Sequence, residues 1–421
     1  DRNTSGEEGD LMATTTAVNA GIGDPALLAA LLSGEKYWPS EPRSTYELGL
    51  SEPFLETLVA KVLLSGGNCT GRRIASEICL PFSIVEATLE RLRTRRLVTH
   101  VGAGQLNDYV YGLTEDGRAR ARVFHQECAY VGPAPVPLMD YVISVEAQAI
   151  GDEPIRRCDF ADAFHDVSVS GELLDLLGPA VNSAGGLFLY GAPGNGKSTL
   201  ANRITSCFGQ EVWLPYAVID GREIITVFDP AYHRRADRDQ SGEAATHDRR
   251  WVRVQRPTVV VGGELTMDNL EIRHDPVSKI SEAPLQMKSN CGCLLIDDFG
   301  RQRISPEDLL NRWIIPLENR HDYLTLATGK KIQIPFQQLI IFSTNLDPSD
   351  LVDEAFLRRI PYRIEVRDPD EDEFHNLFQL AAENAGCSYN PEAVEHLLDN
   401  YYRDRSRPLR RCHARDLLMQ V

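Results

Sequence analysis

The sequence lacks the marks of several protein classes. It contains no apolar run long enough to cross a bilayer and no visible secretory signal, so we expect a cytoplasmic protein without membrane contact. Basic residues are in the minority, 44 against 61 acidic ones, and the formal net charge is −17. This balance argues against a general nucleic-acid coat protein, although a local basic patch is compatible with it.

Close cysteine pairs are also scarce. The nine cysteines are scattered through apolar segments, which fits reduced, mostly buried thiols in a cytoplasm. The one close pair, Cys291-Gly292-Cys293, has no second Cys or His pair at zinc spacing. We interpret this pair as packing at the start of a strand rather than as a metal site.

The composition itself is ordinary for a globular protein. With 421 residues, of which 43% are hydrophobic and 25% charged, the chain can form two or three domains, each with its own core. It begins without methionine and stops inside an expected helix. This suggests a piece of a longer protein, so the missing signal carries little weight.

A glycine-rich motif at residues 191–198 carries most of the functional information. It matches the pattern G-x-x-x-x-G-K-[ST] and lies between a strand candidate at 186–190 and a helix that starts at Ser198. Glycines let backbone N–H groups turn inward around a polyphosphate. Lys197 can reach the β- and γ-phosphates, and the Ser198 hydroxyl can bind Mg²⁺. The predicted nucleotide-binding residues are Gly191, Ala192, Pro193, Gly194, Asn195, Gly196, Lys197, Ser198 and Thr199.

A second signature follows in the expected order. The apolar run Leu294-Leu295-Ile296 ends in two aspartates, Asp297 and Asp298. We predict that Asp297 joins Ser198 in holding Mg²⁺, and that Asp298 polarises the attacking water. An apolar run ending in two aspartates is weak evidence for a nucleotide site by itself, but it is strong evidence when it follows a phosphate loop.

Strands and helices alternate from about residue 160 onward, which predicts a parallel sheet with its ligand-binding edge at the carboxyl ends of the strands. Asn345 ends one such strand, where its amide can orient the water or touch the γ-phosphate. Because Asn345-Leu346-Asp347-Pro348 is also turn chemistry, the alternative is a structural cap. The five strand candidates are Leu187–Tyr190, Trp213–Ile219, Cys293–Ile296, Leu339–Ser343 and Tyr362–Val366.

The joint order of these motifs over residues 155–421 resembles the AAA+ ATPases. The resemblance implies ATP as the nucleotide, Mg²⁺ as the metal, and assembly into a ring or spiral of identical subunits. It also implies that Arg358 or Arg359 reaches into a neighbouring subunit's site. The alternative is a pair of surface arginines. Arg320 is a second candidate for such a role in trans.

The same resemblance assigns residues 368–421 to a small helical lid. A lid helix of this family carries an arginine that senses the nucleotide. We place this role on Arg415 because it stands just before the apolar Leu417-Leu418, with Arg410 and Arg411 as rivals.

Two features depart from the common family pattern. Asp297-Asp298 replaces Asp-Glu, and aspartate is one methylene shorter, so the water would sit closer. An insertion at 221–290, expected between the second and third core strands with a hairpin at 259–266 and 270–274, is either a partner-facing element or a solvated elaboration.

The N-terminal pattern predicts a separate small α+β domain. Its order of three helices, a hairpin and a further helix, with Tyr111–Arg118 at the last junction, resembles a winged helix-turn-helix. Arginines at 72, 73, 91, 93, 95 and 96 could contact DNA phosphates through 71–96, but glutamates stand among them and the hairpin tip carries no Lys or Arg. Docking of protein is therefore the favoured interpretation, and DNA binding is the alternative. The helices are expected at 53–64, 71–80 and 84–96, and the strands at 97–101 and 109–113.

The predicted organisation is an α/β protein: a P-loop AAA+ core with a five-stranded parallel sheet and a C-terminal helical lid, preceded by the winged-helix domain. The expected function is ATP hydrolysis that drives the remodelling of a protein partner or complex. The alternatives are a DNA-associated ATPase of the initiator, loader or regulator type, and a scaffold that binds ATP without useful turnover. The expected segments are a flexible 1–50, the winged helix at 51–130, a linker at 131–154, the core at 155–367 and the lid at 368–421.

Overall fold

The computed structural model describes residues 36–105, 108–151, 154–165, 167, 169–183, 185–208, 211–236, 247–352 and 354–420. Most of the expected flexible segment at 1–50 lies outside these residues. The chain forms two compact units. The first contains the described residues within Asp1–Arg122, Val131–Ala134 and Arg238–Trp251, and the second contains those within Val123–Tyr130, Pro135–Asp237 and Val252–Val421. The five segment boundaries expected from sequence stay predictions.

The N-terminal unit contains helices packed on a small antiparallel sheet with the strand order β1-β3-β2. Polar caps explain where two of its helices start: the Ser51 side chain accepts a hydrogen bond from Phe54 N, and the Thr70 side chain accepts one from Arg73 N. The predicted helices and hairpin are present, with small shifts at their ends. Its elements are α2 Glu52–Gly66, β1 Cys69–Thr70, α3 Gly71–Glu77, α4 Phe82–Thr94, β2 Val98–Ala103, β3 Tyr109–Leu113 and the start of α5 Glu115–Glu127.

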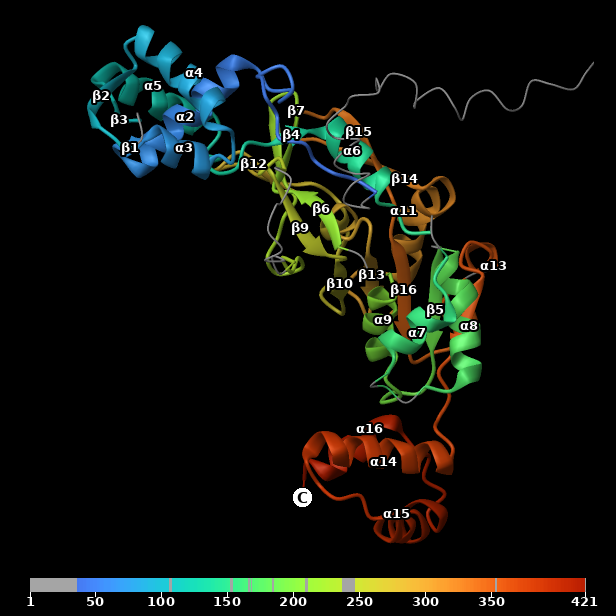
Figure 1. The fold of residues 1–421 in the computed structure, drawn as a ribbon. Helices are drawn as coiled ribbons and strands as arrows, with labels where there is room; N and C mark the ends of the chain where they lie inside the picture. The colour runs from blue at the N-terminus through green and yellow to red at the C-terminus, as the bar shows by residue number, and fades with distance from the viewer. Residues whose placement is uncertain are drawn as a thin grey trace, which may run out of the picture. The chain divides into compact units, whose positions relative to one another are not determined.

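The second unit is built on a parallel sheet with the strand order β10-β13-β16-β5-β17 (Figure 1). The strands are β10 Thr258–Val261, β13 Cys293–Ile296, β16 Leu339–Thr344, β5 Gly186–Tyr190 and β17 Tyr362–Glu365. Four of the five strand candidates from sequence thus lie in this sheet.

The fifth candidate, Trp213–Ile219, was wrong. That segment divides at Tyr216, whose carbonyl accepts hydrogen bonds from Val227 N and Phe228 N at 3.0 and 3.2 Å. The chain therefore turns back on itself and forms a local antiparallel pair instead of a core strand. The β-branched run at 258–261 takes the vacant edge of the core sheet beside β13.

This difference also changes where the insertion at 221–290 lies relative to the core strands. Because β10 is the strand next to β13, most of the inserted residues precede the second core strand, and the hairpin expected at 259–266 and 270–274 does not form. These residues contribute instead to two further sheets, β6-β9 and β11-β12-β8-β7-β4. Their strands are β4 Val136–Pro137, β6 Glu211–Pro215, β7 Ala217–Asp220, β8 Glu223–Thr226, β9 Trp251–Gln255, β11 Arg273–Asp275 and β12 Ile280–Glu282.

Side chains of the core strands alternate between two buried faces, as a sheet covered on both sides requires. Phe188 joins Phe342 and Trp313 on one face, whereas Leu187 and Leu189 pack on the other. The helices that supply these layers are α7 Arg157–Ala163, α8 Gly171–Asn182 and α9 Lys197–Ser206 on the second face, and α11 Pro306–Asn319 on the first. A hairpin of β14 His321–Thr325 and β15 Lys331–Pro335 follows α11.

The chain ends in a helical region, as predicted. Phe374, Phe378 and Leu398 form its small apolar core. Its helices are α14 Glu371–Ala385, α15 Pro391–Leu397, a π-helical turn at Leu398–Arg403, and α16 Arg411–Leu418. The predicted α/β class, with a five-stranded parallel sheet and a helical C-terminal region, is confirmed. None of the described helices has both the length and the apolarity needed to cross a bilayer. The remaining short elements are α6 Leu138–Ala147, η1 Met267–Leu270, α10 Leu285–Lys288, α12 Pro348–Leu351 and α13 Glu354–Leu357.

Candidate nucleotide site

A six-residue loop, here called the glycine loop (191–196), connects β5 to α9. Gly191, Gly194 and Gly196 have φ angles of 138°, 86° and 80°, a region that residues with side chains rarely adopt. A Cβ at Gly191 would stand 2.5 Å from the Val366 carbonyl oxygen, and one at Gly194 would stand 2.6 Å from Cys412 Sγ. Both positions therefore need glycine for packing as well as for backbone shape.

Lys197 starts α9 directly after the glycine loop and is buried. Its ammonium group donates to Gly191 O at 3.0 Å, to Ala192 O at 3.1 Å and to Asn345 Oδ1 at 2.7 Å. Burial lowers the pKa of Lys197 below its ordinary value, while two nearby carboxylates act in the opposite direction. The lysine is thus held over the loop by neutral oxygens.

Ser198 and Asp297 meet across the gap between α9 and β13. Ser198 Oγ donates to Asp297 Oδ2 at 2.7 Å, and Asp297 directly follows the last residue of β13. A hydroxyl and a carboxylate are hard oxygen ligands of the kind Mg²⁺ uses together with phosphates and water. Among the described residues no group of three or more His, Cys, Asp or Glu side chains could hold a metal ion, so any metal here would need further ligands from a nucleotide or solvent.

Asn345 connects the lysine to the second aspartate. Its Oδ1 accepts from Lys197, and its Nδ2 donates to Asp298 Oδ1 at 3.2 Å. The alternative role as a turn cap does not fit the contacts, because Thr344 Oγ1 accepts from Leu346 N and the Asp347 side chain caps α12. β13 and β16 are neighbouring parallel strands, which is why residues 47 positions apart meet at their carboxyl ends.

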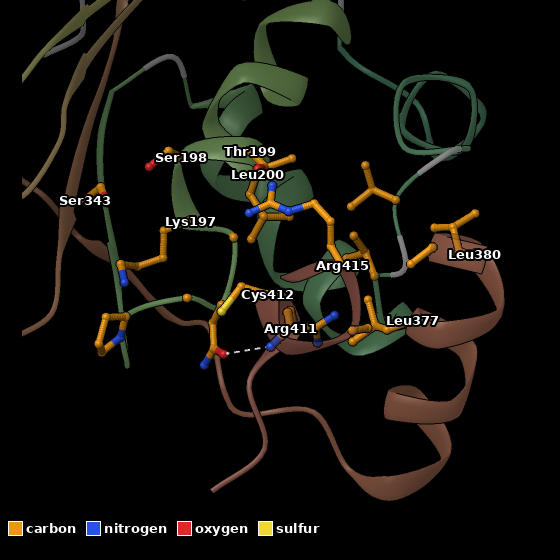
Figure 2. Close-up of a pocket in the computed structure, with 18 of the residues that line it drawn as sticks. Lys197, Ser198, Thr199, Leu200, Ser343, Leu377, Leu380, Arg411, Cys412 and Arg415 are labelled. Atoms are coloured by element: carbon orange, nitrogen blue, oxygen red, sulfur yellow. Dashed lines mark hydrogen bonds between the residues drawn. The ribbon is translucent and has the colours of Figure 1, made fainter. Parts of the chain in front are cut away.

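These residues line a cavity of about 850 Å³ that the C-terminal helices close on one side (Figure 2). Its polar part holds Lys197, Ser198 and the two aspartates, whereas Leu377 and Leu380 of α14 contribute an apolar wall. A volume of this size suits a ligand as large as a nucleotide. Further apolar lining comes from Val167, Val169, Leu173, Ala381 and Leu418.

Two of the three candidate sensor arginines line the cavity. The Arg415 side chain extends toward Thr199 and Leu200 in Figure 2 and pairs with Asp416 at 2.9 Å. Arg411 also lines the cavity but is held by Glu373 at 3.0 Å. The third candidate, Arg410, is not among the lining residues and forms an ion pair with Asp368.

The arginines predicted to act in trans are not brought to this cavity. Arg358 is exposed at the end of α13, and Arg359 pairs with Glu318 at 2.6 Å. Arg320 caps α11 with a φ of 58° and donates to Ser183 O at 3.4 Å. None of the three lines the cavity, so within one chain they take no part in the site.

The sequence did not indicate that α16 contacts the glycine loop directly. Cys412 N donates to Gly194 O at 2.9 Å, and Arg411 N donates to Asn195 Oδ1 at 3.4 Å, a bond drawn in Figure 2. The buried Asn195 amide also donates to Asp368 Oδ1 at 2.7 Å. Asn195 therefore ties the loop to the C-terminal helices, and no motif spacing marks that role.

Comparisons with known proteins give little beyond this geometry. A model of a domain of unknown function, DUF8689, matches residues 370–421, and no curated protein matches the chain significantly. Among solved structures, NtrX from Brucella abortus in complex with ADP is 15% identical with a TM-score of 0.36, covering 62% of this chain and 52% of that chain. A magnesium chelatase complex of subunits BchI and BchD is 18% identical with a TM-score of 0.35, covering 64% and 77%. The chain thus spans about half the length of the NtrX structure, and TM-scores this low carry no functional inference.

Proposed function

We propose that this chain is an ATP-binding and ATP-hydrolysing protein of the AAA+ superfamily. The observation that supports this best is the convergence of Lys197, Ser198, Asp297, Asp298 and Asn345 around one glycine loop at the carboxyl edge of a parallel sheet. Each of these groups suits one part of phosphoryl transfer. The choice of ATP over GTP comes from the family resemblance.

The residues present fit a nucleoside triphosphate and Mg²⁺. Backbone N–H groups of the glycine loop and the first turn of α9 can bind phosphate oxygens, and Lys197 can exchange its carbonyl partners for β- and γ-phosphate oxygens. Ser198 and Asp297 would hold Mg²⁺. The metal, when bound, neutralises charge on the phosphates.

Hydrolysis requires a water in line with the γ-phosphorus. In the proposed step the water oxygen bonds to that phosphorus, the bond to the β–γ bridging oxygen breaks, and ADP and phosphate leave. Asp298 accepts a proton from the water. Asn345 orients the same water, since its amide already contacts the Asp298 carboxylate. Arg415 lies on the cavity wall, where it would contact the γ-phosphate and so link the nucleotide state to the position of the C-terminal helices.

Assembly into a ring or open spiral is part of the proposal. The exposed Arg358, or its neighbour Arg359, would complete the site of an adjacent subunit. Hydrolysis would then remodel a protein partner or complex. The cysteines stand as thiols and not as disulfides, which supports a reducing, cytoplasmic compartment.

Complementation between two inactive variants tests the trans arginines. Asp298→Asn lacks the water-activating carboxylate but keeps its arginines, and Arg358→Ala with Arg359→Ala keeps its own site. We expect each variant alone to be nearly inactive. In a 1:1 mixture with random assembly, about a quarter of the sites combine an intact Asp298 with intact arginines from the neighbouring subunit, so about a quarter of wild-type turnover should return. An exposed-arginine control, Arg222→Ala, should behave as wild type. A mixture with proven subunit exchange that regains no activity would contradict sharing.

The N-terminal unit is proposed to be a winged helix that docks protein. Three of the arginines considered for DNA are already used within the unit, which reduces the charge available to phosphates. The hairpin instead presents apolar surface at Val101 and Tyr109, which are 55% and 48% exposed. The pairs are Arg91 with Glu52 and Glu56, Arg95 with Glu56, and Arg93 with Glu90.

One assay tests ATP hydrolysis and separates it from the DNA-associated alternative. We expect the chain to release phosphate from ATP only when Mg²⁺ is present, and to do so at the same rate with and without duplex DNA at low salt. Strong stimulation by DNA would favour the initiator, loader or regulator type. Tight ATP binding without turnover at any protein concentration would leave only a nucleotide-gated scaffold.

A further inference from the structure

The residue proposed to activate water stands in an unusual backbone conformation. Asp298 has a φ of 51° and Gly300 has one of 101°. Glycine adopts such angles freely, whereas aspartate, like asparagine, adopts them less often and at some cost, which contacts with the surroundings can offset. The turn that follows β13 therefore has to be held in place for the Asp298 carboxylate to stay near Asn345.

The side chain of Gln302 provides that support. Its Nε2 donates to two successive carbonyls, Asp297 O at 2.9 Å and Asp298 O at 3.0 Å, and its Oε1 accepts from Gly300 N at 2.8 Å. One planar amide thus satisfies three backbone groups of the turn. Two backbone bonds complete the turn: Phe299 N donates to Ser343 O at 2.7 Å, and Arg301 N donates to Asp298 O at 3.0 Å.

We propose that Gln302 is a positioning residue for ATP hydrolysis, an inference that rests on the proposed function. By clamping both carbonyls beside the aspartates, Gln302 keeps the Asp298 carboxylate facing Asn345 and the cavity. It touches neither nucleotide nor metal in this role. The amide of Gln302 is required because an ionised glutamate cannot donate to the two carbonyls, and methionine has no donor and only a weakly accepting sulfur.

A positioning role for Gln302 has kinetic consequences that a merely structural role would lack. If Gln302 acts only through Asp298, its loss must slow the chemical step without weakening ATP binding, since the glycine loop and Lys197 lie on other elements. Its loss must also matter little once Asp298 can no longer accept a proton. Residues that act as one unit are non-additive in this way.

The test compares Gln302→Met with Gln333→Met, the same change at an exposed glutamine of β15. Three quantities are measured for each purified full-length chain: kcat for ATP with Mg²⁺, the Kd of ATP, and the Tm. We expect Gln302→Met to lower kcat about 100-fold, the scale of a displaced reacting group. The Kd of ATP should stay close to wild type, and the Tm should fall slightly because three backbone groups of the turn lose their partner. In the Asp298→Asn background the same change should lower kcat by less than about twofold.

Two results would overturn the inference while leaving the proposed function intact. One is a Gln302→Met chain that hydrolyses ATP at the wild-type rate, and the other is an equally large loss in the Asp298→Asn background. If Gln302→Met does not fold, Gln302→Glu is used, which keeps the acceptor for Gly300 N but loses both donors and should show the same selective loss of kcat. A wild-type chain that binds ATP but never hydrolyses it would overturn the proposed function as well.

Discussion

Replacing Lys197 with alanine is expected to weaken ATP binding by at least about 30-fold, because truncating a buried charge that pairs with phosphate costs roughly 2–5 kcal/mol. In the chain without nucleotide this ammonium group is bound by two loop carbonyls and by Asn345. Phosphate oxygens can replace those neutral partners with a charge-assisted contact, which alanine cannot offer. The Kd of ATP, measured by fluorescence titration or calorimetry, checks this result.

The matched control for this substitution is Lys331→Ala. Lys331 is exposed on β15, far along the chain from the glycine loop and absent from the cavity lining. It should bind ATP as the wild type does, which would show that loss of a positive charge alone has no effect. Equal ATP affinity in the Lys197→Ala chain and the wild type would contradict the assignment of the glycine loop to phosphate binding.

Replacing Asp298 with asparagine should produce the opposite pattern, with ATP still bound and turnover lowered about 10²- to 10⁴-fold, the range for loss of a general base. Asparagine preserves the size of the side chain and tolerates the positive φ of 51°. Its Oδ1 can still accept from Asn345 Nδ2, so the turn should stay in place. The change therefore removes the proton acceptor and little else.

Single-turnover kinetics together with ATP affinity measure this effect. Asp268→Asn is the control, because Asp268 is exposed and lies outside the cavity lining. Wild-type turnover in the Asp298→Asn chain would show that another group activates the water. Together, the two substitutions separate binding, which depends on Lys197, from chemistry, which depends on Asp298.

The sequence by itself determined the α/β class, four of the five core strands and the residues that meet at the sheet edge. Leu187–Tyr190 and Cys293–Ile296 are short apolar runs followed by small or polar residues. Such runs can be recognised locally because both faces of a parallel strand are buried. The carboxyl ends of neighbouring parallel strands lie at one edge. This is why Asp298 and Asn345 could be expected together before any contact was known.

Only the tertiary structure decided which segment fills the sheet edge beside β13. Trp213–Ile219 and the run at 258–261 both contain β-branched or aromatic residues, so β-propensity alone does not choose between them, although Pro215 inside the first segment disfavours a central strand. The outcome depends on the backbone partners of Tyr216, which turn the first segment into a local hairpin. The position of the insertion follows from that choice.

The tertiary structure also decided the contacts between polar side chains and distant backbone. Gln302 belongs to no motif, yet its amide holds the turn that carries Asp298. Asn195 joins the glycine loop to α16, and Arg91 is paired with glutamates instead of being available to DNA. Such bonds depend on distance and angle, which residue type and spacing do not specify. The sequence thus determined which chemical groups the site contains, and the tertiary structure decided what holds each of them in place.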